Sequence, residues 1–366
     1  MLHLREQINE GALKAGDPLP TREKLMKEHG LSLSTVTRAI SELERQGWLV
    51  SRQGSGTFVV KRSADGDKET AEPNLVGLIM PVNYSSADGL VSEIVEEGIQ
   101  KNINVMIMFS PEDEEAELNM ARTMFDKEVR AMIWFPVQPK KHVSVASLFG
   151  KNKKPVIIGE KVSEYSNPSW YIVRRDYYGG AREAIEHFLQ QGHVRIAYAG
   201  PKGGESDFGP IPERWNAYKD AMKRRDLWNP DALVINPAMF KEWHVNLTRL
   251  ESIFRGSHPP TALAAYDDII ALEAARALKT LGLRIPDDIA IIGHGDFSYG
   301  RYSEPRLSTV SPCTSEYADA IIRVLCNELG LEMDSRYTND EREIVISQRL
   351  LLRESTHSKN ELMAAN

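Results

Sequence analysis

Apolar residues in the first 60 positions recur at helical spacing and then give way to two short β-type runs. Intervals of three or four residues predict three short helices, carried by Leu4 and Ile8, by Leu25 and Met26, and by Val36, Ala39, Ile40 and Leu43. The run WLVSRQGSGTFVV follows, with β-rich stretches on either side of Gly54 and Gly56. Glycines at that place allow the tight turn of a hairpin. The predicted order is three helices and then a β-hairpin.

From Asn74 onward, apolar β-type runs alternate with amphipathic helical segments. Strands are predicted at VGLIMPV, VMIMF, AMIWFPV, PVIIGE, RIAYAG, TALAAY and DIAIIGHG, and helices at VSEIVEEGIQ, ELNMARTMF, REAIEHFLQQG and ALEAARALKTLG. Such alternation predicts parallel sheets with crossover helices. Because the strands are too many for one small sheet, we expect an α/β fold of two similar lobes with a cleft.

A polar run containing Gly and Pro, KRSADGDKETAEPN, separates these two regions and reads as a linker. The predicted organisation is a small domain over 1–60, a linker over 61–74, a two-lobed domain over 75–356 and a disordered tail over 357–366.

Composition and charge narrow the class of protein. Of 366 residues, 42% are hydrophobic and 27% are charged, as in soluble globular proteins. Residues 1–62 carry ten Lys and Arg against seven Asp and Glu, whereas the rest of the chain has a net charge of −10. This asymmetry favours contact with phosphates at the N-terminal end. Because a signal-peptide pattern and an 18-residue apolar run are both absent from the sequence, we expect a cytoplasmic protein.

Three helices followed by a hairpin is the order of a winged-helix DNA-binding domain. Ser32 can cap a helix that begins near Leu33, and the apolar stripe of that helix leaves polar residues on its other face. In helix-turn-helix proteins, the first residues of the second helix contact base edges. The candidate DNA contacts are Arg22, Lys24, Ser34, Thr35, Thr37, Arg38, Arg52, Gln53, Gly54 and Gly56. The GSG segment is equally compatible with an ordinary tight hairpin.

Residues 2–60 resemble the gluconate-repressor (GntR) winged-helix family. The resemblance rests on GDPLPT, on the pair Thr35-Val36, on SELERQGWL and on RQGSGTFV. The family usually has Arg at the position of Glu23, and often at those of Leu33 and Thr37. The resemblance therefore implies a double-stranded DNA operator as partner, with Arg22, Lys24 and Arg38 taking over these contacts.

Polar side chains follow several predicted strands of the second region, where open α/β sheets bind ligands. They are Tyr84, Arg214, Asp267, Asp268 and Asp296. Arginine offers a planar fork of donors, the aspartates accept from hydroxyls and a tyrosine ring can stack. The set suits a polyhydroxy ligand, so we expect a sugar as the effector.

Residues 74–356 resemble the lactose/galactose-repressor (LacI/GalR) family and, more distantly, periplasmic sugar-binding proteins. The matching phrases are VRRDYYGGAREAIEHFLQQGHVRIAYAGP, ERWNAYKDAM, PPTALAAYDDIIALEAARALKTLGLRIPDDIAIIG, PRLSTV and SQRLLLREST. The resemblance implies effector contacts at Arg214 and Asp267. The family's late aspartate falls on Gly295, with Asp296 one position on.

Four further residues have more than one interpretation. Asp176 matches a recurring family acid near the lobe interface, yet it can equally cap the helix that follows. Trp215 stands beside Arg214 and could stack on a sugar face, although an aromatic is often part of a core. His193 and His294 have no second ligand at metal spacing, so we predict that both are structural.

Chemistry other than binding finds little support in the sequence. Cys313 and Cys326 form no zinc or disulfide pattern, and GHGDFS is only a partial match to a dinucleotide-binding motif. Nucleophile-elbow, P-loop and HExxH motifs are not present, so we predict no enzymatic activity, metal or cofactor.

The predicted function is a sugar-controlled transcription regulator, a repressor by family default, that binds a near-palindromic operator as a homodimer. Whether the effector releases or strengthens DNA binding stays open. The alternatives are a transport or chemoreception binding protein and a sugar-modifying enzyme.

Overall fold

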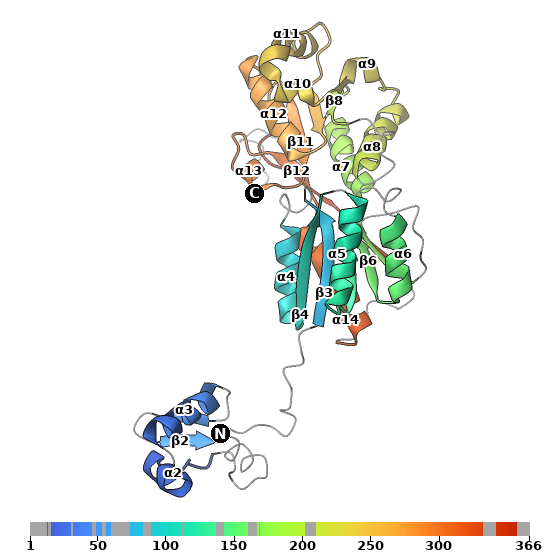
Figure 1. The fold of residues 1–366 in the computed structure, drawn as a ribbon. Coiled ribbons are helices and arrows are strands. Elements are labelled where there is room, and N and C mark those ends of the chain that lie inside the picture. Colours follow the sequence, from blue (N-terminus) through green and yellow to red (C-terminus); the bar gives the residue numbers. More distant parts are fainter. Residues whose placement is uncertain are drawn as a thin grey trace. The chain divides into compact units, whose positions relative to one another are not determined.

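A computed structural model of the chain (Figure 1) describes residues 13, 16–30, 32–45, 49–52, 56–59, 74–82, 89–111, 113–136, 143–159, 167, 169–201, 210–331 and 342–356. The chain divides into two compact units, 1–72 and 73–366. The predicted tail lies outside the described residues, as does nearly all of the predicted linker.

The N-terminal unit contains α2 (Arg22–His29), α3 (Leu33–Arg45), β1 (Leu49–Arg52) and β2 (Gly56–Val59). Thr21 Oγ1 accepts from the backbone N–H of Lys24 and caps α2. Ser32 Oγ accepts from the backbone N–H of Thr35 at 3.2 Å. This bond confirms the predicted cap and the predicted start of α3. The helix predicted around Leu4 and Ile8 lies outside the described residues.

The core of this unit forms where the apolar stripe of α3 faces the hairpin. Val36, Ile40 and Leu43 are between 0% and 3% exposed, and they pack against Leu19, Leu25, Leu49 and Val59. The two strands pair antiparallel. The backbone N–H of Leu19 adds a bond to Thr57 O at 2.7 Å. Because an isolated hairpin is marginal in water, this core and this bond hold β1 and β2 in place.

The first lobe of the C-terminal unit is a parallel sheet in the order β13-β7-β6-β5-β3-β4. Its strands are β3 (Asn74–Pro81), β4 (Ile103–Ser110), β5 (Ala131–Trp134), β6 (Val156–Gly159), β7 (Tyr171–Arg175) and β13 (Glu343–Ile346). Helices α4 (Leu90–Gln100) and α14 (Thr314–Leu329) cover one face. Helices α5 (Glu114–Asp126) and α6 (Val143–Asn152) cover the other. Asn74, which the sequence assigns to the linker, is instead the buried first residue of β3.

The second lobe is a sheet in the order β14-β12-β11-β10-β8-β9, parallel except for β14. Its strands are β8 (Ile196–Ala199), β9 (Val234–Ile235), β10 (Ala262–Ala265), β11 (Ala290–His294), β12 (Ser308–Ser311) and β14 (Arg349–Leu351). Helices α7 (Tyr177–Gln190) and α8 (Pro210–Arg224) pack on one face. The other face carries α10 (Ala238–Lys241), α11 (Trp243–Phe254) and α12 (Asp268–Thr280). The short helices α9 (Pro230–Leu233) and α13 (Ser298–Arg301) lie in the connections.

The chain passes between the lobes three times, after Arg175, after Pro312 and after Ile346. These passages lie together, because Arg175 Nε donates to Pro312 O at 3.2 Å and the backbone N–H of Asp176 donates to Ile346 O at 2.9 Å. The passages leave from the carboxyl ends of β7, β12 and β13. The carboxyl ends of both parallel sheets therefore face one boundary between the lobes, which we call the interlobe seam.

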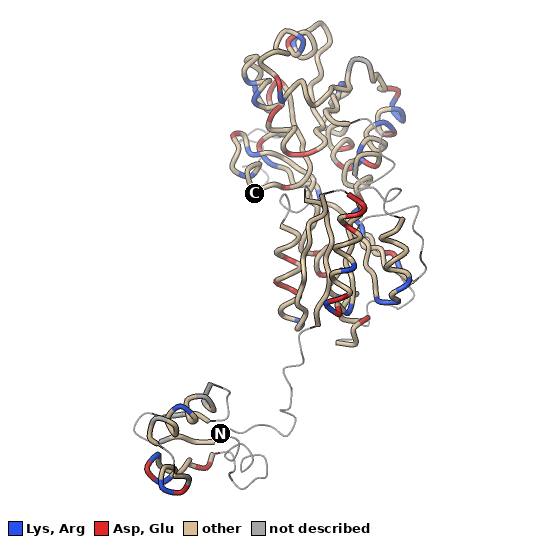
Figure 2. The backbone as a smooth tube through the Cα atoms, in the orientation of Figure 1, with Lys and Arg blue, Asp and Glu red and all other residues tan. Residues whose placement is uncertain are grey.

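Charged residues keep to the helices and loops, and most strands carry none (Figure 2). Strands covered on both faces need such continuous apolar runs. The observed sheets confirm the predicted α/β class with two lobes.

Leu43 is fully buried in the small core of the N-terminal unit. We expect Leu43→Ala to lower the free energy of unfolding of this unit by about 2–5 kcal/mol, because it leaves a cavity that the six other buried side chains of the core cannot close. Leu33→Ala, at a residue 54% exposed, should change it by less than about 0.5 kcal/mol. Chemical denaturation followed by circular dichroism measures both, and equal losses would contradict the assignment of this core.

Candidate effector site and nucleic-acid interface

Helix α3 presents polar residues on the side away from its core. Arg38 and Thr35 are exposed and Thr37 is half-buried. The hydroxyls of Thr35 and Ser32 lie 2.8 Å apart, so Thr35 helps to build the start of the helix as well as facing outward. The side chain of Ser34 lies outside the described residues. The arrangement leaves Arg38 as the most accessible cation of α3 among the side chains that the structure describes.

The other DNA-contact candidates are only partly described. Arg22 and Lys24 are exposed in the first turn of α2, and Lys24 Nζ lies 3.7 Å from a Glu28 carboxylate oxygen. An exposed pair of this kind contributes little to stability, so it leaves Lys24 able to reach a phosphate. Arg52 and Gly56 are register partners at the tip of the hairpin. The side chain of Arg52 and the whole of Gln53 and Gly54 lie outside the described residues.

Arg214 reaches from α8 to the carboxyl end of β10. Its Nη1 donates to Tyr266 O at 2.7 Å, and its guanidinium lies 5.1 Å from the ring centre of Tyr177 and 4.9 Å from that of Tyr266. The residue is only 8% exposed. Two aromatic faces and a carbonyl thus stabilise a buried cation at the interlobe seam.

Asp267 is the N-cap of α12 at the same strand end. Its Oδ1 accepts from the backbone N–H of Ile270 at 2.8 Å and caps the helix. Burial raises the pKa of Asp267, while the Ile270 N–H and the Arg214 charge oppose that rise. The two residues that the LacI/GalR resemblance assigns to the effector therefore lie close to one another at this end of the second sheet.

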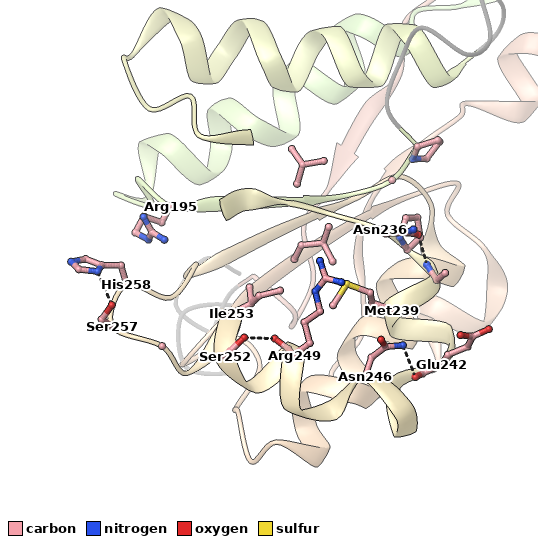
Figure 3. Close-up of a pocket in the computed structure, with 17 residues that line it drawn as sticks. Arg195, Asn236, Met239, Glu242, Asn246, Arg249, Ser252, Ile253, Ser257 and His258 are labelled. Carbon is pink, nitrogen blue, oxygen red and sulfur yellow. Dashed lines mark hydrogen bonds between the residues drawn. The ribbon is translucent and has the colours of Figure 1, made fainter. Parts of the chain in front are cut away.

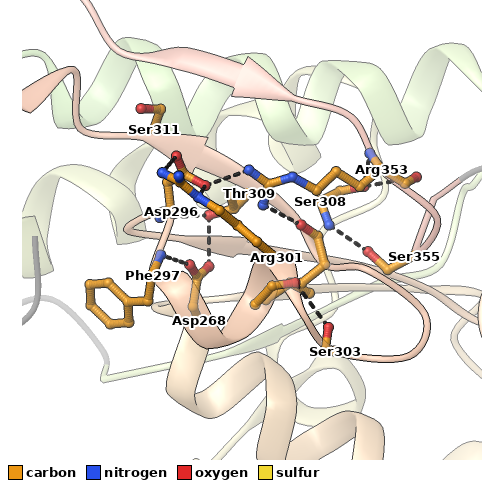
Figure 4. Close-up of polar contacts among 12 residues, drawn as sticks. Asp268, Asp296, Phe297, Arg301, Ser303, Ser308, Thr309, Ser311, Arg353 and Ser355 are labelled. Carbon is orange, nitrogen blue, oxygen red and sulfur yellow. Dashed lines mark hydrogen bonds and ion pairs between the residues drawn. The ribbon is translucent and has the colours of Figure 1, made fainter.

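Asp268, the neighbour of Asp267, makes its hydrogen bonds inside the second lobe. It is fully buried, and its carboxylate accepts from Thr309 Oγ1 at 2.6 Å and from the backbone N–H of Phe297 at 2.8 Å (Figure 4). A Cβ on Gly293 would lie 2.2 Å from Asp268 Oδ1, which explains the first glycine of GHGDFS by close packing. Asp268 thus positions the loop after β11, and an effector contact at this residue stays a prediction.

Asp296 is likewise held by protein groups. Its carboxylate pairs with Arg301 at 2.6 Å and with Arg353 (Figure 4), and its backbone adopts a left-handed φ of 50°. The predicted sugar contact is thus an ion-pair centre that ties the loop after β11 to the segment after β14. Its place at the carboxyl end of β11 agrees with the sequence, but its partners could not be foreseen.

Two further candidates have structural roles. Asp176 Oδ1 accepts from the backbone N–H of Gly179 at 2.8 Å, which is the capping alternative that the sequence left open. Trp215 is buried in the core on the α7 and α8 face and packs against Tyr198, Tyr218 and Trp228. This packing supports the core alternative for Trp215, and its stacking on a sugar stays a prediction. Tyr84 lies outside the described residues.

The structure adds two residues that sequence reasoning did not assign to the site. His294 ends β11 and its Nδ1 lies 2.9 Å from Ala265 O. Tyr198 lies on β8 and its hydroxyl is packed against Gly200, where a Cβ would come within 2.7 Å of it. Both side chains are buried and lie at the strand ends beside Arg214. The one signal in the sequence is that His294 is the polar last residue of an apolar strand.

A cavity lined by described residues lies elsewhere in the second lobe. It has a volume of about 980 Å³ and borders β9, α10 and α11, with Arg195, Asn236, Glu242, Arg249 and His258 among its walls (Figure 3). Arg249 points into it beside Met239, whereas Arg195 and His258 lie at one end. Arg214 and Asp267 are not in its lining. The seam, where buried polar groups converge, is therefore the better candidate for the effector site.

Metal and membrane sites find no support in the described part of the chain. Its His, Cys, Asp and Glu residues form no group of three that could hold a metal ion. None of its helices has the length and apolar character to cross a bilayer.

Comparison with known proteins gives a family match at each end. Residues 1–59 match the bacterial regulatory proteins of the gntR family, and residues 185–356 match the periplasmic-binding-protein-like domain. The arabinose metabolism transcriptional repressor of Geobacillus stearothermophilus is 25% identical over 363 residues, covering 95% of this chain and 94% of that protein. These matches confirm the two resemblances found in the sequence.

Solved structures agree with the fold of the C-terminal unit. A putative transcriptional regulator of the LacI family from Sanguibacter keddieii has a TM-score of 0.61 and 22% identity, covering 78% of this chain and 99% of that one. A LacI family regulator from Lactobacillus casei, solved with bound sucrose, has a TM-score of 0.61 and 23% identity, covering 77% of this chain and 99% of that one.

Burial raises the pKa of Asp268 to about 6, against the opposing hydrogen bonds from Thr309 and Phe297. The folded chain then keeps this proton to a higher pH than the unfolded chain, so stability falls as pH rises from about 4 to about 6 and stays lower above that. The difference of about two pKa units corresponds to about 3 kcal/mol. In Asp268→Asn the side chain keeps its size and one acceptor but has no proton to lose in this range. The free energy of unfolding of the variant should therefore not show this decrease.

Urea denaturation between pH 4 and pH 7, followed by tryptophan fluorescence, measures the effect as the difference between wild type and variant. The other titrating groups cancel in that comparison. Parallel pH profiles of the two proteins would contradict the raised pKa of Asp268.

Proposed function

We propose that this chain, which joins a GntR-family DNA-binding domain to a periplasmic-binding-protein-like domain, is a transcription repressor controlled by a sugar bound at the interlobe seam. The observation that carries the proposal is the buried cation Arg214 beside the carboxylate of Asp267, at the carboxyl ends of the strands. Buried polar groups that converge at such strand ends are typical of a ligand site.

The relatives support the class of ligand. The Geobacillus protein is named for arabinose metabolism, another relative from Haemophilus influenzae is a ribose operon repressor, and the Lactobacillus casei regulator was solved with sucrose and with glucose. A carboxylate accepts from two hydroxyls at once and a guanidinium donates to them. Asp267 and Arg214 together are therefore suited to adjacent hydroxyls of a sugar.

The N-terminal unit supports the DNA-binding half of the proposal. Its core holds α3 with Thr35 and Arg38 outward, and the first turns of such a helix contact base edges in the major groove. Arg22, Lys24 and the tip of the hairpin, with Arg52, Gln53, Gly54 and Gly56, supply the contacts proposed for phosphates and the minor groove. Ser34 and Thr37 complete the proposed reading face.

The chain acts in the cytoplasm as a homodimer on a near-palindromic operator, because two identical helices placed about a two-fold axis read two half-sites. Its role is binding and not catalysis, as for the relatives named as transcription repressors. The effector changes DNA affinity by binding the two lobe arrangements unequally.

Selection of genomic fragments by the purified full-length chain at near-physiological salt tests the regulator directly, because non-specific binding falls steeply with salt. We expect a few enriched sites that share a palindrome, next to genes that handle the effector. A folded dimer that enriches no site would overturn the DNA-binding half and favour a sensor or solute-binding protein.

Two substitutions should separate DNA binding from sugar binding. Arg38→Ala should weaken operator binding about tenfold or more and leave the sugar affinity unchanged. Arg214→Ala should weaken sugar binding by at least tenfold, since charged hydrogen bonds contribute about 1.5–3 kcal/mol, and should leave the affinity of the sugar-free protein for the operator unchanged. Electrophoretic mobility shift and calorimetry measure the two affinities. Lys223→Ala, at an exposed residue of α8, is the control, and defects exchanged between the two variants would refute the assignment.

A further inference from the structure

Three buried polar atoms at the interlobe seam have no hydrogen-bond partner among the described residues. They are Tyr198 Oη, Arg214 Nε and His294 Nε2, on side chains that are 2%, 8% and 4% exposed. An unpaired buried polar group is unfavourable, and folded proteins contain few of them. Three such atoms at the same edge of the second sheet, from β8, α8 and β11, therefore indicate a small polar group that binds between them.

The hydrogen bond of His294 to the backbone fixes which ring nitrogen carries the proton. Its Nδ1 lies 2.9 Å from Ala265 O, and a carbonyl oxygen can only accept, so Nδ1 is the donor. In a neutral imidazole the other nitrogen is then an acceptor. Burial, with the nearby Arg214 charge, lowers the pKa of His294 to about 3, so the ring is neutral at physiological pH. His294 Nε2 thus presents a lone pair.

Arg214 presents the opposite chemistry at the same place. Its Nη1 donates to Tyr266 O, the carbonyl that follows the one held by His294, so the two side chains are fastened to successive residues at the end of β10. The remaining Nε–H can only donate. A group placed between the two side chains has to accept from Arg214 and donate to His294.

A hydroxyl does both. We propose that one hydroxyl of the bound sugar accepts from Arg214 Nε and donates to His294 Nε2, and that this pair selects a neutral hydroxyl at that position over a phosphate or carboxylate. The inference rests on the proposed sugar-sensing function and adds His294 as a specificity-determining residue.

Binding of an anionic oxygen at this position is unfavourable. Such an oxygen has no proton to donate, so its lone pairs would face the lone pair of His294 Nε2, and only the Arg214 donor would gain a partner. Asp267, close to Arg214, would repel it further. Tyr198 Oη can either donate or accept and so fits a second hydroxyl.

Two substitutions of His294 separate its two nitrogens. In His294→Asn the amide nitrogen takes the place of Nδ1 and can keep the bond to Ala265 O, but the acceptor is lost. In His294→Gln the amide oxygen can take the place of Nε2 and keep the acceptor. His193→Asn, at the opposite end of the same sheet and bonded to Thr261, is the matched control.

The probes are arabinose, ribose, glucose and sucrose, measured by calorimetry with the full-length chain, followed by the deoxy series of the sugar that binds tightest. We expect His294→Asn to weaken that sugar about ten- to a hundredfold, with His294→Gln and the control within about threefold of wild type. The deoxy sugar that lacks the hydroxyl bound by His294 should bind wild type and His294→Asn with equal affinity, because it has no contact for the variant to lose. The analogue with phosphate at that carbon should bind wild type more weakly than the parent sugar.

The outcomes separate the two proposals. If His294→Asn binds the sugar as tightly as wild type does, only the His294 contact is overturned. The same holds if the variant binds every deoxy sugar more weakly than wild type does. Tighter binding of the phosphate analogue overturns the selection of a neutral group. If wild type binds no sugar in the panel while it still binds its operator, the sugar-sensing function fails and the inference fails with it.

Discussion

The hydrogen bonds at the carboxyl end of β10 hold together the elements that form the second lobe's side of the seam. Within four residues, Ala265 O and Tyr266 O accept from His294 and Arg214, Asp267 caps α12, and Asp268 holds Thr309 and the backbone of Phe297. Parallel strands gather their carboxyl ends at one edge, so a strand in the middle of the sheet can reach side chains from α8, β11 and β12 at once. One short segment thereby fixes the helix, the neighbouring loop and the charged side chains of the seam.

Burial at this point has opposite consequences for acids and bases. It raises the pKa of Asp267 and Asp268 and lowers that of His294, because a medium of low polarity disfavours every charged form. The guanidinium of Arg214 is held among two aromatic rings and a carbonyl. The seam therefore combines the cation of Arg214, the carboxylate of Asp267 and a neutral His294, a combination suited to hydroxyls.

The periodic part of the fold follows from the sequence, and the direction of single side chains does not. Alternating apolar runs predicted the two sheets, and Ser32 predicted the start of α3. Asp267 and Asp268 are adjacent and chemically identical, yet Asp268 turns under β11, because Gly293 leaves room and its partners come from residues 29 and 41 positions away. Trp215 follows Arg214 directly, but neighbouring residues of a helix point about 100° apart, so one faces the seam and the other the core.

Communication between the seam and the rest of the chain is constrained by the three passages between the lobes. Arg175 donates to Pro312 O and lies over the ring of Tyr317 at 4.4 Å, while Asp176 is bonded to Ile346 O. Any change in the angle between the lobes has to turn about this bonded set, because every covalent path crosses it. A ligand held only by the second lobe would bind every angle equally and shift nothing. Control of DNA binding by the sugar therefore requires contacts from both lobes, so that the free energy gained at Arg214 and Asp267 favours one lobe arrangement over the other.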